Sequence, residues 1–318
     1  MYEYDGLELA PGYATHLDRL SAVARDNPLQ GLAGTRLRYD ILGERYTYAR
    51  PAGMRVRNTS VVLPGREIPL RIYWPAHETT PAVILYIHGG GFVAGSLDSH
   101  DMIVAQLAQA TGAVVVSVQY RRTPENPYPA PQNDCWEALQ WTVANGELLG
   151  WDASRLAVAG DSAGGLLSTA VCMLAKQRGG PSIRCQALIY GVFDMNPERL
   201  YYRTAKDTTL TYDSIRPLVP AYLGSHPRAA GDPVAVPLRA STEDLRGLPP
   251  AYLLNAAYDS LLEEELEYAA LLEGAGVPVK IETVPGTMHG FLRAMDVCPA
   301  AREAFDRMAA AMNRRLAA

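Results

Sequence analysis

Short apolar runs alternate with longer segments of helical character along most of the chain. The apolar runs predict buried strands over residues 82–87, 113–119, 155–159, 185–190, 250–257 and 278–284. Helices are predicted between and after them, over residues 98–110, 133–145, 162–177, 261–274 and 300–316. Strands that are apolar throughout and separated by helices are typical of a mainly parallel sheet with helices on both faces. The ends of such strands meet at one edge of the sheet, where ligands bind.

An antiparallel hairpin is predicted before the alternating part of the chain. Two β-like runs, 56–63 and 68–74, flank the turn sequence Pro64-Gly65-Arg66-Glu67.

Residues 1–45 and 192–240 do not follow the alternating pattern. The first segment mixes helix and turn signals, and the second contains no good strand but several prolines and large side chains, including Phe193, Met195, Tyr201, Tyr202, Tyr212 and Tyr222. Because a long insert in an α/β domain is usually functional, we predict that the two segments form a helical cap. The core would then comprise 46–191 and 241–318. The alternative is an ordinary excursion with a small core of its own.

Composition and charge argue against several classes of partner. The chain of 318 residues has 29 basic and 34 acidic side chains, a net charge of −5 and no block of like charge, which argues against nucleic acid or an anionic membrane surface. No apolar stretch reaches the roughly 18 residues of a membrane span, and the N-terminus lacks an apolar leader. We therefore expect a cytoplasmic protein with no membrane partner, and a homodimer on general frequency alone.

The four cysteines, Cys135, Cys172, Cys185 and Cys298, form no C-x-x-C pair. They are expected to be free, buried thiols rather than a metal site or a redox motif.

Two glycine-containing motifs follow predicted strands. Gly160-Asp161-Ser162-Ala163-Gly164 comes directly after strand 155–159, where a sharp turn into a helix would present Ser162 as a nucleophile. His88-Gly89-Gly90-Gly91 follows strand 82–87 and could offer backbone N–H groups to an oxyanion. Together they indicate an acyl-transferring serine hydrolase.

A serine nucleophile needs a base, and the base needs an orienting acid. Of six histidines, only His289 lies in a loop after a late strand. The others are assigned elsewhere: His16 and His77 outside the repeat, His88 at the glycine run, His100 in a capping or surface role at a helix start, and His226 in the cap.

The acid must lie between the serine and the histidine in the chain order of this fold. Asp259 follows strand 250–257 and is preferred. Asp194 comes too early. The remaining candidates are first-turn residues of the next helix, where they would face its dipole: Glu263, Glu264 and Glu265.

These residues suggest a mechanism. His289 removes the proton of Ser162, Asp259 orients His289, and the amides of Gly89, Gly90 and Ala163 bind the oxyanion. Substrate contacts are predicted at Phe92, Asp161, Tyr190, Phe193 and Tyr212.

The motifs resemble the bacterial hormone-sensitive-lipase-like esterases. The resemblance rests on the glycine run through Phe92, the elbow, the block 120–130, Asp259-Ser260-Leu261 and His289-Gly290-Phe291, and spans about residues 55–316. The segments 95–101 and 285–289 are most similar to the acetyl-esterase branch. The resemblance implies an α/β-hydrolase fold, with a mostly parallel sheet of about eight strands flanked by helices and a helical cap. It also implies hydrolysis of short-acyl carboxylic esters, a small-molecule substrate and no cofactor.

Three alternatives remain open. The same triad could cleave N-acetyl or other amide bonds. Some relatives of this fold are ligand-binding receptors that have lost the catalytic histidine, whereas this chain keeps Ser162, Asp259 and His289. A nucleotide-binding oxidoreductase is disfavoured because Gly89, Gly91 and Gly95 have the spacing G-x-G-x-x-x-G and no ribose-binding acid follows.

Overall fold

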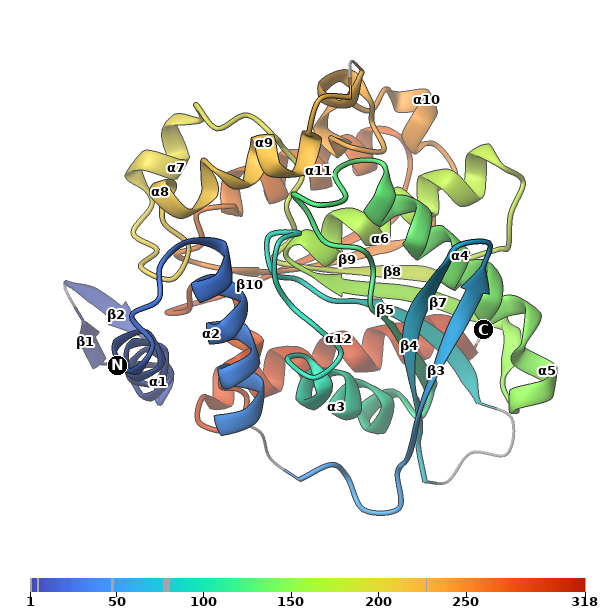
Figure 1. Cartoon of the computed structure of the whole chain (residues 1–318), viewed down its shortest axis with the longest axis horizontal. Helices are drawn as coiled ribbons and strands as arrows, with labels where there is room; N and C mark the ends of the chain where they lie inside the picture. The colour runs from blue at the N-terminus through green and yellow to red at the C-terminus, as the bar shows by residue number, and fades with distance from the viewer. Residues whose placement is uncertain (1, 5, 47–48, 77–80, 227, 318) are drawn as a thin grey trace.

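An eight-stranded sheet forms the centre of the protein (Figure 1). The computed structural model describes residues 2–4, 6–46, 49–76, 81–226 and 228–317. The strand order is β10-β9-β8-β7-β5-β6-β4-β3. All neighbours are parallel except that β4 is antiparallel to both β3 and β6. The strands are β3 Arg55–Leu63, β4 Arg66–Trp74, β5 Ala82–Ile87, β6 Val114–Val118, β7 Asp152–Asp161, β8 Cys185–Ile189, β9 Ala251–Ala256 and β10 Val279–Val284.

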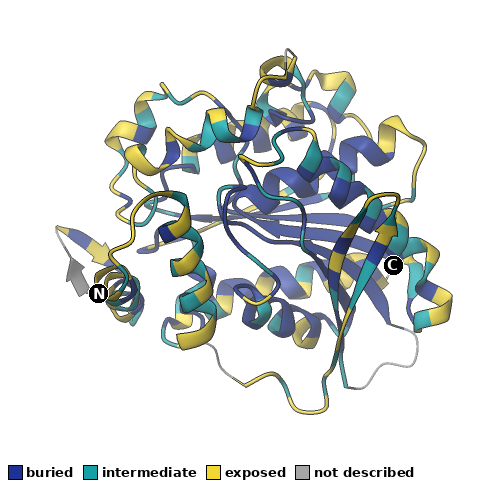
Figure 2. Cartoon of the chain, in the orientation of Figure 1, coloured by how far each residue is buried: buried dark blue, intermediate teal, exposed yellow. Residues whose placement is uncertain are grey.

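Helices cover both faces of this sheet. On one face lie α4 Ala130–Ala144, α6 Ala163–Gln177 and α11 Leu262–Gly274, and on the other α3 Asp101–Thr111 and α12 Pro299–Ala317 (Figure 1). The central strands are buried on both sides (Figure 2). In β5, Val83, Leu85 and Ile87 join one apolar cluster, whereas Ile84 and Tyr86 join the other. This alternation explains why the strand is apolar throughout.

The predicted α/β architecture is confirmed, with small shifts at element ends. The helix predicted from residue 133 begins at Ala130, because Pro131 lies in its first turn, where proline's missing N–H costs nothing. Five short elements were not anticipated: β1 Tyr2–Tyr4 and β2 Leu7–Leu9, which pair separately from the main sheet, and α5 Gly146–Leu149, α10 Thr242–Leu245 and η3 Phe291–Ala294. All four cysteines are free and buried, as expected.

Two groups of helices lie beside the sheet end that carries the predicted motifs. The N-terminal group is α1 Tyr13–Asp26 and α2 Gly31–Arg45. The second lies within 192–240, which contains no strand in its described residues and comprises α7 Leu200–Thr204, α8 Tyr212–Ile215, α9 Leu218–Leu223, η1 Ala229–Gly231 and η2 Pro237–Arg239. Beyond them are α10 Thr242–Leu245 and η3 Phe291–Ala294. We call 1–45 and 192–240 the cover segments; the predicted domain boundaries stay a prediction.

Across the described residues, no helix combines the length and apolarity needed to cross a bilayer.

Candidate active site

Ser162 occupies a tight turn between β7 and α6. Its φ of 56° and ψ of −120° place a non-glycine residue in a region that L side chains rarely adopt. The glycines on either side are required by space. A Cβ at Gly164 would lie 1.9 Å from the carbonyl oxygen of Ile87, and one at Gly160 would lie 2.3 Å from the carbonyl oxygen of Gly164. Gly164 is therefore required by close packing of the elbow against β5, and Gly160 by close packing within the elbow itself.

The three predicted catalytic side chains come together at the end of the sheet. His289 Nε2 lies 2.8 Å from Ser162 Oγ, and His289 Nδ1 lies 2.8 Å from Asp259 Oδ2. Asp259 is fully buried, and its other oxygen accepts the amide hydrogen of Leu261 at 2.8 Å. A base within reach of both a hydroxyl and an orienting carboxylate can activate the serine as a nucleophile.

The surroundings of His289 favour its protonated form. Burial lowers the pKa of the imidazole, but the charge and hydrogen bond of Asp259, and then the charges of Asp207 and Asp161, outweigh burial. The net pKa of His289 is raised above 6.5. Such a base accepts the serine proton readily and holds it until the leaving group takes it.

One of the three predicted oxyanion donors, Gly89, is already engaged within the fold. The Gly89 amide donates to Asp161 Oδ1 at 3.0 Å, so it does not point into the site. In the part of the chain that the structure describes, the amides of Gly90, Gly91 and Ala163 have no hydrogen-bond acceptor. Gly90 and Gly91 line the cavity beside Ser162. Sequence reasoning could not show which glycine amide was already engaged, so Gly91 was not among the predicted donors.

Asp161 anchors the glycine loop to the elbow. Its buried carboxylate accepts hydrogen bonds from Tyr86 Oη at 2.7 Å and from the Gly89 amide, and His100 Nε2 lies 3.3 Å away. Burial raises the pKa of Asp161, but the charge and hydrogen bond of His100 and the hydroxyl of Tyr86 lower it far below the usual range. The expected capping or surface role of His100 is wrong, since it makes no capping bond and is 1% exposed. His77 lies outside the described residues.

A cavity of about 550 Å³ lies over Ser162 and His289. Its walls come from the glycine loop, from α2 and from residues 192–221. Of the five predicted substrate contacts only Phe92 lines it. The predicted contacts outside its lining are Asp161, Tyr190, Phe193 and Tyr212. Tyr190 packs edge-on against the His289 ring, and Phe193 stacks on Tyr268 in the core.

Asp207, in the second cover segment, holds the loop of the catalytic histidine. Its Oδ2 accepts the His289 amide at 3.1 Å, and its Oδ1 accepts the amides of Thr209 at 2.7 Å and Leu210 at 3.0 Å. Thr209 Oγ1 donates to the His289 carbonyl at 3.1 Å. Burial and the nearby charge of Asp259 raise the pKa of Asp207. The Asp-x-Thr pattern of an Asx turn was the only sequence signal for this residue.

Known proteins are similar to this chain in sequence and in fold. A family model described as "alpha/beta hydrolase fold" matches residues 84–293. The chain belongs to the α/β-hydrolase family. This family member is 38% identical to the carboxylesterase NlhH of Mycobacterium tuberculosis over 83% of each chain. It is 36% identical to the ethyl acetate hydrolase of Pseudomonas putida, over 79% of this chain and 80% of that one.

Among solved structures, the ester hydrolase EH1AB1 from the Lake Arreo metagenome superimposes with a TM-score of 0.87 at 33% identity. The match covers 98% of this α/β-hydrolase and 100% of that chain, which was solved with a bipyridine phosphonate derivative. The resemblance to hormone-sensitive-lipase-like esterases is confirmed, and the protein is a carboxylic ester hydrolase.

Acidic residues tie both cover segments of this α/β-hydrolase to the core. Glu125 accepts two hydrogen bonds of 2.7 Å from Arg36 in α2. Glu264, buried in the first turn of α11, accepts the Phe193 amide at 2.7 Å and the hydroxyl of Tyr202. Burial raises the pKa of Glu264 to about 8, although both hydrogen bonds lower it. The expected first-turn position of this glutamate is confirmed, and its side chain is fully buried.

Proposed function

We propose that this ester hydrolase cleaves short-acyl carboxylic esters through an acyl-enzyme on Ser162. The observation that carries the proposal is the chain of two 2.8 Å contacts from Ser162 Oγ through the His289 ring to Asp259. The Ser162 hydroxyl is a poor nucleophile alone, and this arrangement removes its proton at the moment of attack.

The reaction proceeds in two acyl transfers. Ser162 Oγ attacks the ester carbonyl carbon while its proton passes to His289 Nε2. The amides of Gly90, Gly91 and Ala163 bind the negative oxygen, and Ala163 adds the positive end of the α6 dipole. His289 then donates the proton to the leaving alcohol. Water then attacks the acyl carbon while His289 takes its proton. His289 passes that proton to Ser162 Oγ as the acyl–oxygen bond breaks, and the carboxylic acid is released.

The proposal of a short acyl group rests on the wall next to the oxyanion site. The side chain of Leu218, from α9, packs so closely on the glycine loop that a Cβ at Gly91 would lie 2.7 Å from Leu218 Cδ1. An acyl chain leaving the carbonyl meets this apolar wall, which favours groups of roughly two to six carbons. The name of the ethyl acetate hydrolase among the relatives points the same way.

Two assays test the proposal. Ser162→Ala should keep the fold, measured by circular dichroism, and lose at least about 1,000-fold in ester turnover. A series of p-nitrophenyl esters with wild-type protein should give its highest kcat/KM with short acyl groups. Wild-type turnover in Ser162→Ala would show that Ser162 is not the nucleophile. A maximum of kcat/KM at long acyl chains would refute the short-acyl preference.

The amide-hydrolase alternative is distinguished by matched substrates. We expect the wild-type protein to hydrolyse an aryl acetate much faster than the corresponding acetanilide. Equal rates on the two would favour amide hydrolysis by the same triad.

A further inference from the structure

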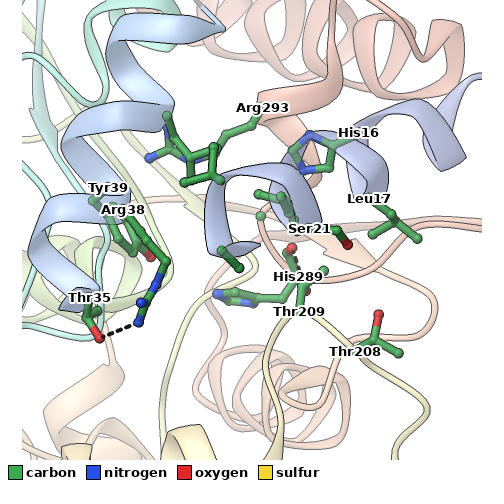
Figure 3. A pocket seen from close by; sticks show the side chains of 15 residues that line it. His16, Leu17, Ser21, Thr35, Arg38, Tyr39, Thr208, Thr209, His289 and Arg293 are labelled. Atoms are coloured by element: carbon green, nitrogen blue, oxygen red, sulfur yellow. Dashed lines mark hydrogen bonds between the residues drawn. The ribbon is translucent and has the colours of Figure 1, made fainter. Parts of the chain in front are cut away.

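A second cavity, of about 340 Å³, lies between α1 and α2 on the His289 side of the site (Figure 3). It includes neither Ser162 nor the oxyanion glycines. Figure 3 shows side chains of α2 on one side, side chains of α1 on the other, and the His289 ring between them. The two cavities share a border of five residues, which are Thr35, Arg38, Tyr39, Thr209 and His289.

The position of this cavity suits the leaving group of an ester. During acyl transfer the carbonyl oxygen points to the amides of Gly90 and Gly91, which line only the larger cavity. The departing alcohol must instead lie within reach of His289 Nε2, from which it takes its proton. His289 is the catalytic side chain that borders both spaces. The alcohol part of a substrate therefore extends toward the smaller cavity.

Arg38 gives that border an unbalanced positive charge. The other two arginines of α2 have acidic partners: Arg36 pairs with Glu125 and Arg45 with Asp26. Arg38 donates to the carbonyl oxygens of Leu29 at 2.9 Å and Asn27 at 3.5 Å and to Thr35 Oγ1 at 3.4 Å, and has no carboxylate partner among the described residues. A guanidinium in this setting has donors left for a ligand.

No acid lines the smaller cavity in the described residues, so nothing there neutralises Arg38. Burial, together with the charges of Arg293 and Arg19, lowers the pKa of His16 to about 3, and its ring is therefore neutral at working pH. Arg293 contributes a second positive charge, although its guanidinium is directed to the Ser99 carbonyl and to His100. In the larger cavity, Asp194 is held by Arg199.

We propose that the smaller cavity is the leaving-group site and that Arg38 makes it select esters whose alcohol part carries a carboxylate. This inference rests on the proposed esterase function and narrows its substrate class to acyl esters of small hydroxy acids. A guanidinium binds a carboxylate through two parallel N–H···O bonds, which give orientation as well as affinity. A volume of about 340 Å³ accommodates one substituted ring or a short branched chain.

The test compares two acetate esters of similar size that differ in charge, 3-acetoxybenzoate and 3-acetoxybenzamide. Wild-type protein is compared with Arg38→Met, which keeps side-chain length without the charge. Arg25→Met is the matched control, because Arg25 is exposed in the last turn of α1 and does not line either cavity. We expect Arg38→Met to lower kcat/KM for the anionic ester relative to the neutral one by about tenfold, and Arg25→Met to leave the ratio unchanged.

A second measurement needs no variant. Free 3-hydroxybenzoate should inhibit wild-type hydrolysis of the neutral ester more strongly than phenol does, and added salt should reduce the difference.

The outcomes separate this inference from the function on which it rests. An unchanged ratio in Arg38→Met, or equal inhibition by 3-hydroxybenzoate and phenol, overturns the carboxylate selectivity. Continued hydrolysis of the neutral ester, lost in Ser162→Ala, would still support the esterase. If wild-type protein hydrolyses neither ester, both proposals fall.

Discussion

Replacing Gly164 by alanine should disturb the protein more than its size suggests. The added Cβ would lie 1.9 Å from the carbonyl oxygen of Ile87 and 2.7 Å from its carbonyl carbon. Because Cβ contacts under 3.0 Å essentially do not occur, α6 and β5 must separate by about 1.1 Å. Both contacts are backbone atoms of Ile87 in the fully buried strand β5, so no side-chain rotation can relieve the overlap.

The cost has a structural and a catalytic part. Forced separation of packed backbone should destabilise the fold by about 3 kcal/mol, at the upper end for overpacking. It also moves Ser162 relative to the glycine loop, and a displacement of about 1 Å typically costs about 100-fold in turnover. Urea unfolding would measure the first effect, and kcat/KM on p-nitrophenyl acetate the second.

Gly274→Ala is the matched control for this experiment. Gly274 ends α11, has no atom within 4 Å of the position that an alanine Cβ would take, and does not have a positive φ. Alanine there should therefore leave stability and activity almost unchanged. If Gly164→Ala matches Gly274→Ala in both unfolding midpoint and turnover, close packing of the elbow on β5 is not what the G-x-S-x-G pattern encodes.

Three further outcomes follow from the charged groups. The kcat/KM of the wild-type protein should fall at low pH with an apparent pKa above 6.5, because His289 must be neutral to act and its pKa is raised; an acid limb below 6.5 would contradict this. Asp207→Asn should move that limb to lower pH, because one negative charge near the imidazole is lost. It should also reduce kcat/KM about tenfold, because the side-chain NH2 group of asparagine would face one of the backbone N–H groups that the carboxylate binds. Asp232→Asn, elsewhere in the cover, should do neither. Glu264 is protonated when folded up to pH about 8 but ionises at about 4.5 when unfolded, so its stabilising contribution is complete below pH 4.5 and is lost as pH rises to 8. Glu264→Gln should therefore reduce the fall in unfolding free energy between pH 5 and 8 by a few kcal/mol. An equal fall in wild-type protein and in Glu264→Gln would contradict the raised pKa of Glu264.

The sheet and the order of its catalytic loops could be predicted because local signals agree with the fold there. β5 and the second half of β7 are buried at successive positions; His88-Gly89 follows β5 and Ser162 follows β7, so strand end and motif coincide. The acid and the histidine were located by the same rule, from their place after β9 and β10. Chain order then selected among the carboxylates.

The cover and the substrate contacts could not be predicted in the same way. Aromatic composition marked 192–240 as unusual, but it could not show that Phe193 turns into the core while Leu218 turns to the cavity. The amide of Gly89 was misassigned for a related reason, since its partner, Asp161, lies 72 positions away in sequence. Such long-range contacts depend on packing rather than on any local pattern.

Because Asp207 and Thr209 are hydrogen-bonded to the His289 loop, residues 207–210 of the second cover segment cannot move away from the core independently of His289. Lifting residues 207–210 would break the bonds to the His289 amide and carbonyl, and would withdraw support from the base itself. Ester entry and alcohol exit must therefore take place while this part of the cover stays seated. The α2 side is held to the core by Arg36, which pairs with Glu125 and donates to the carbonyl oxygens of Val93 and Thr123, and motion there would leave the bonds of the His289 loop intact.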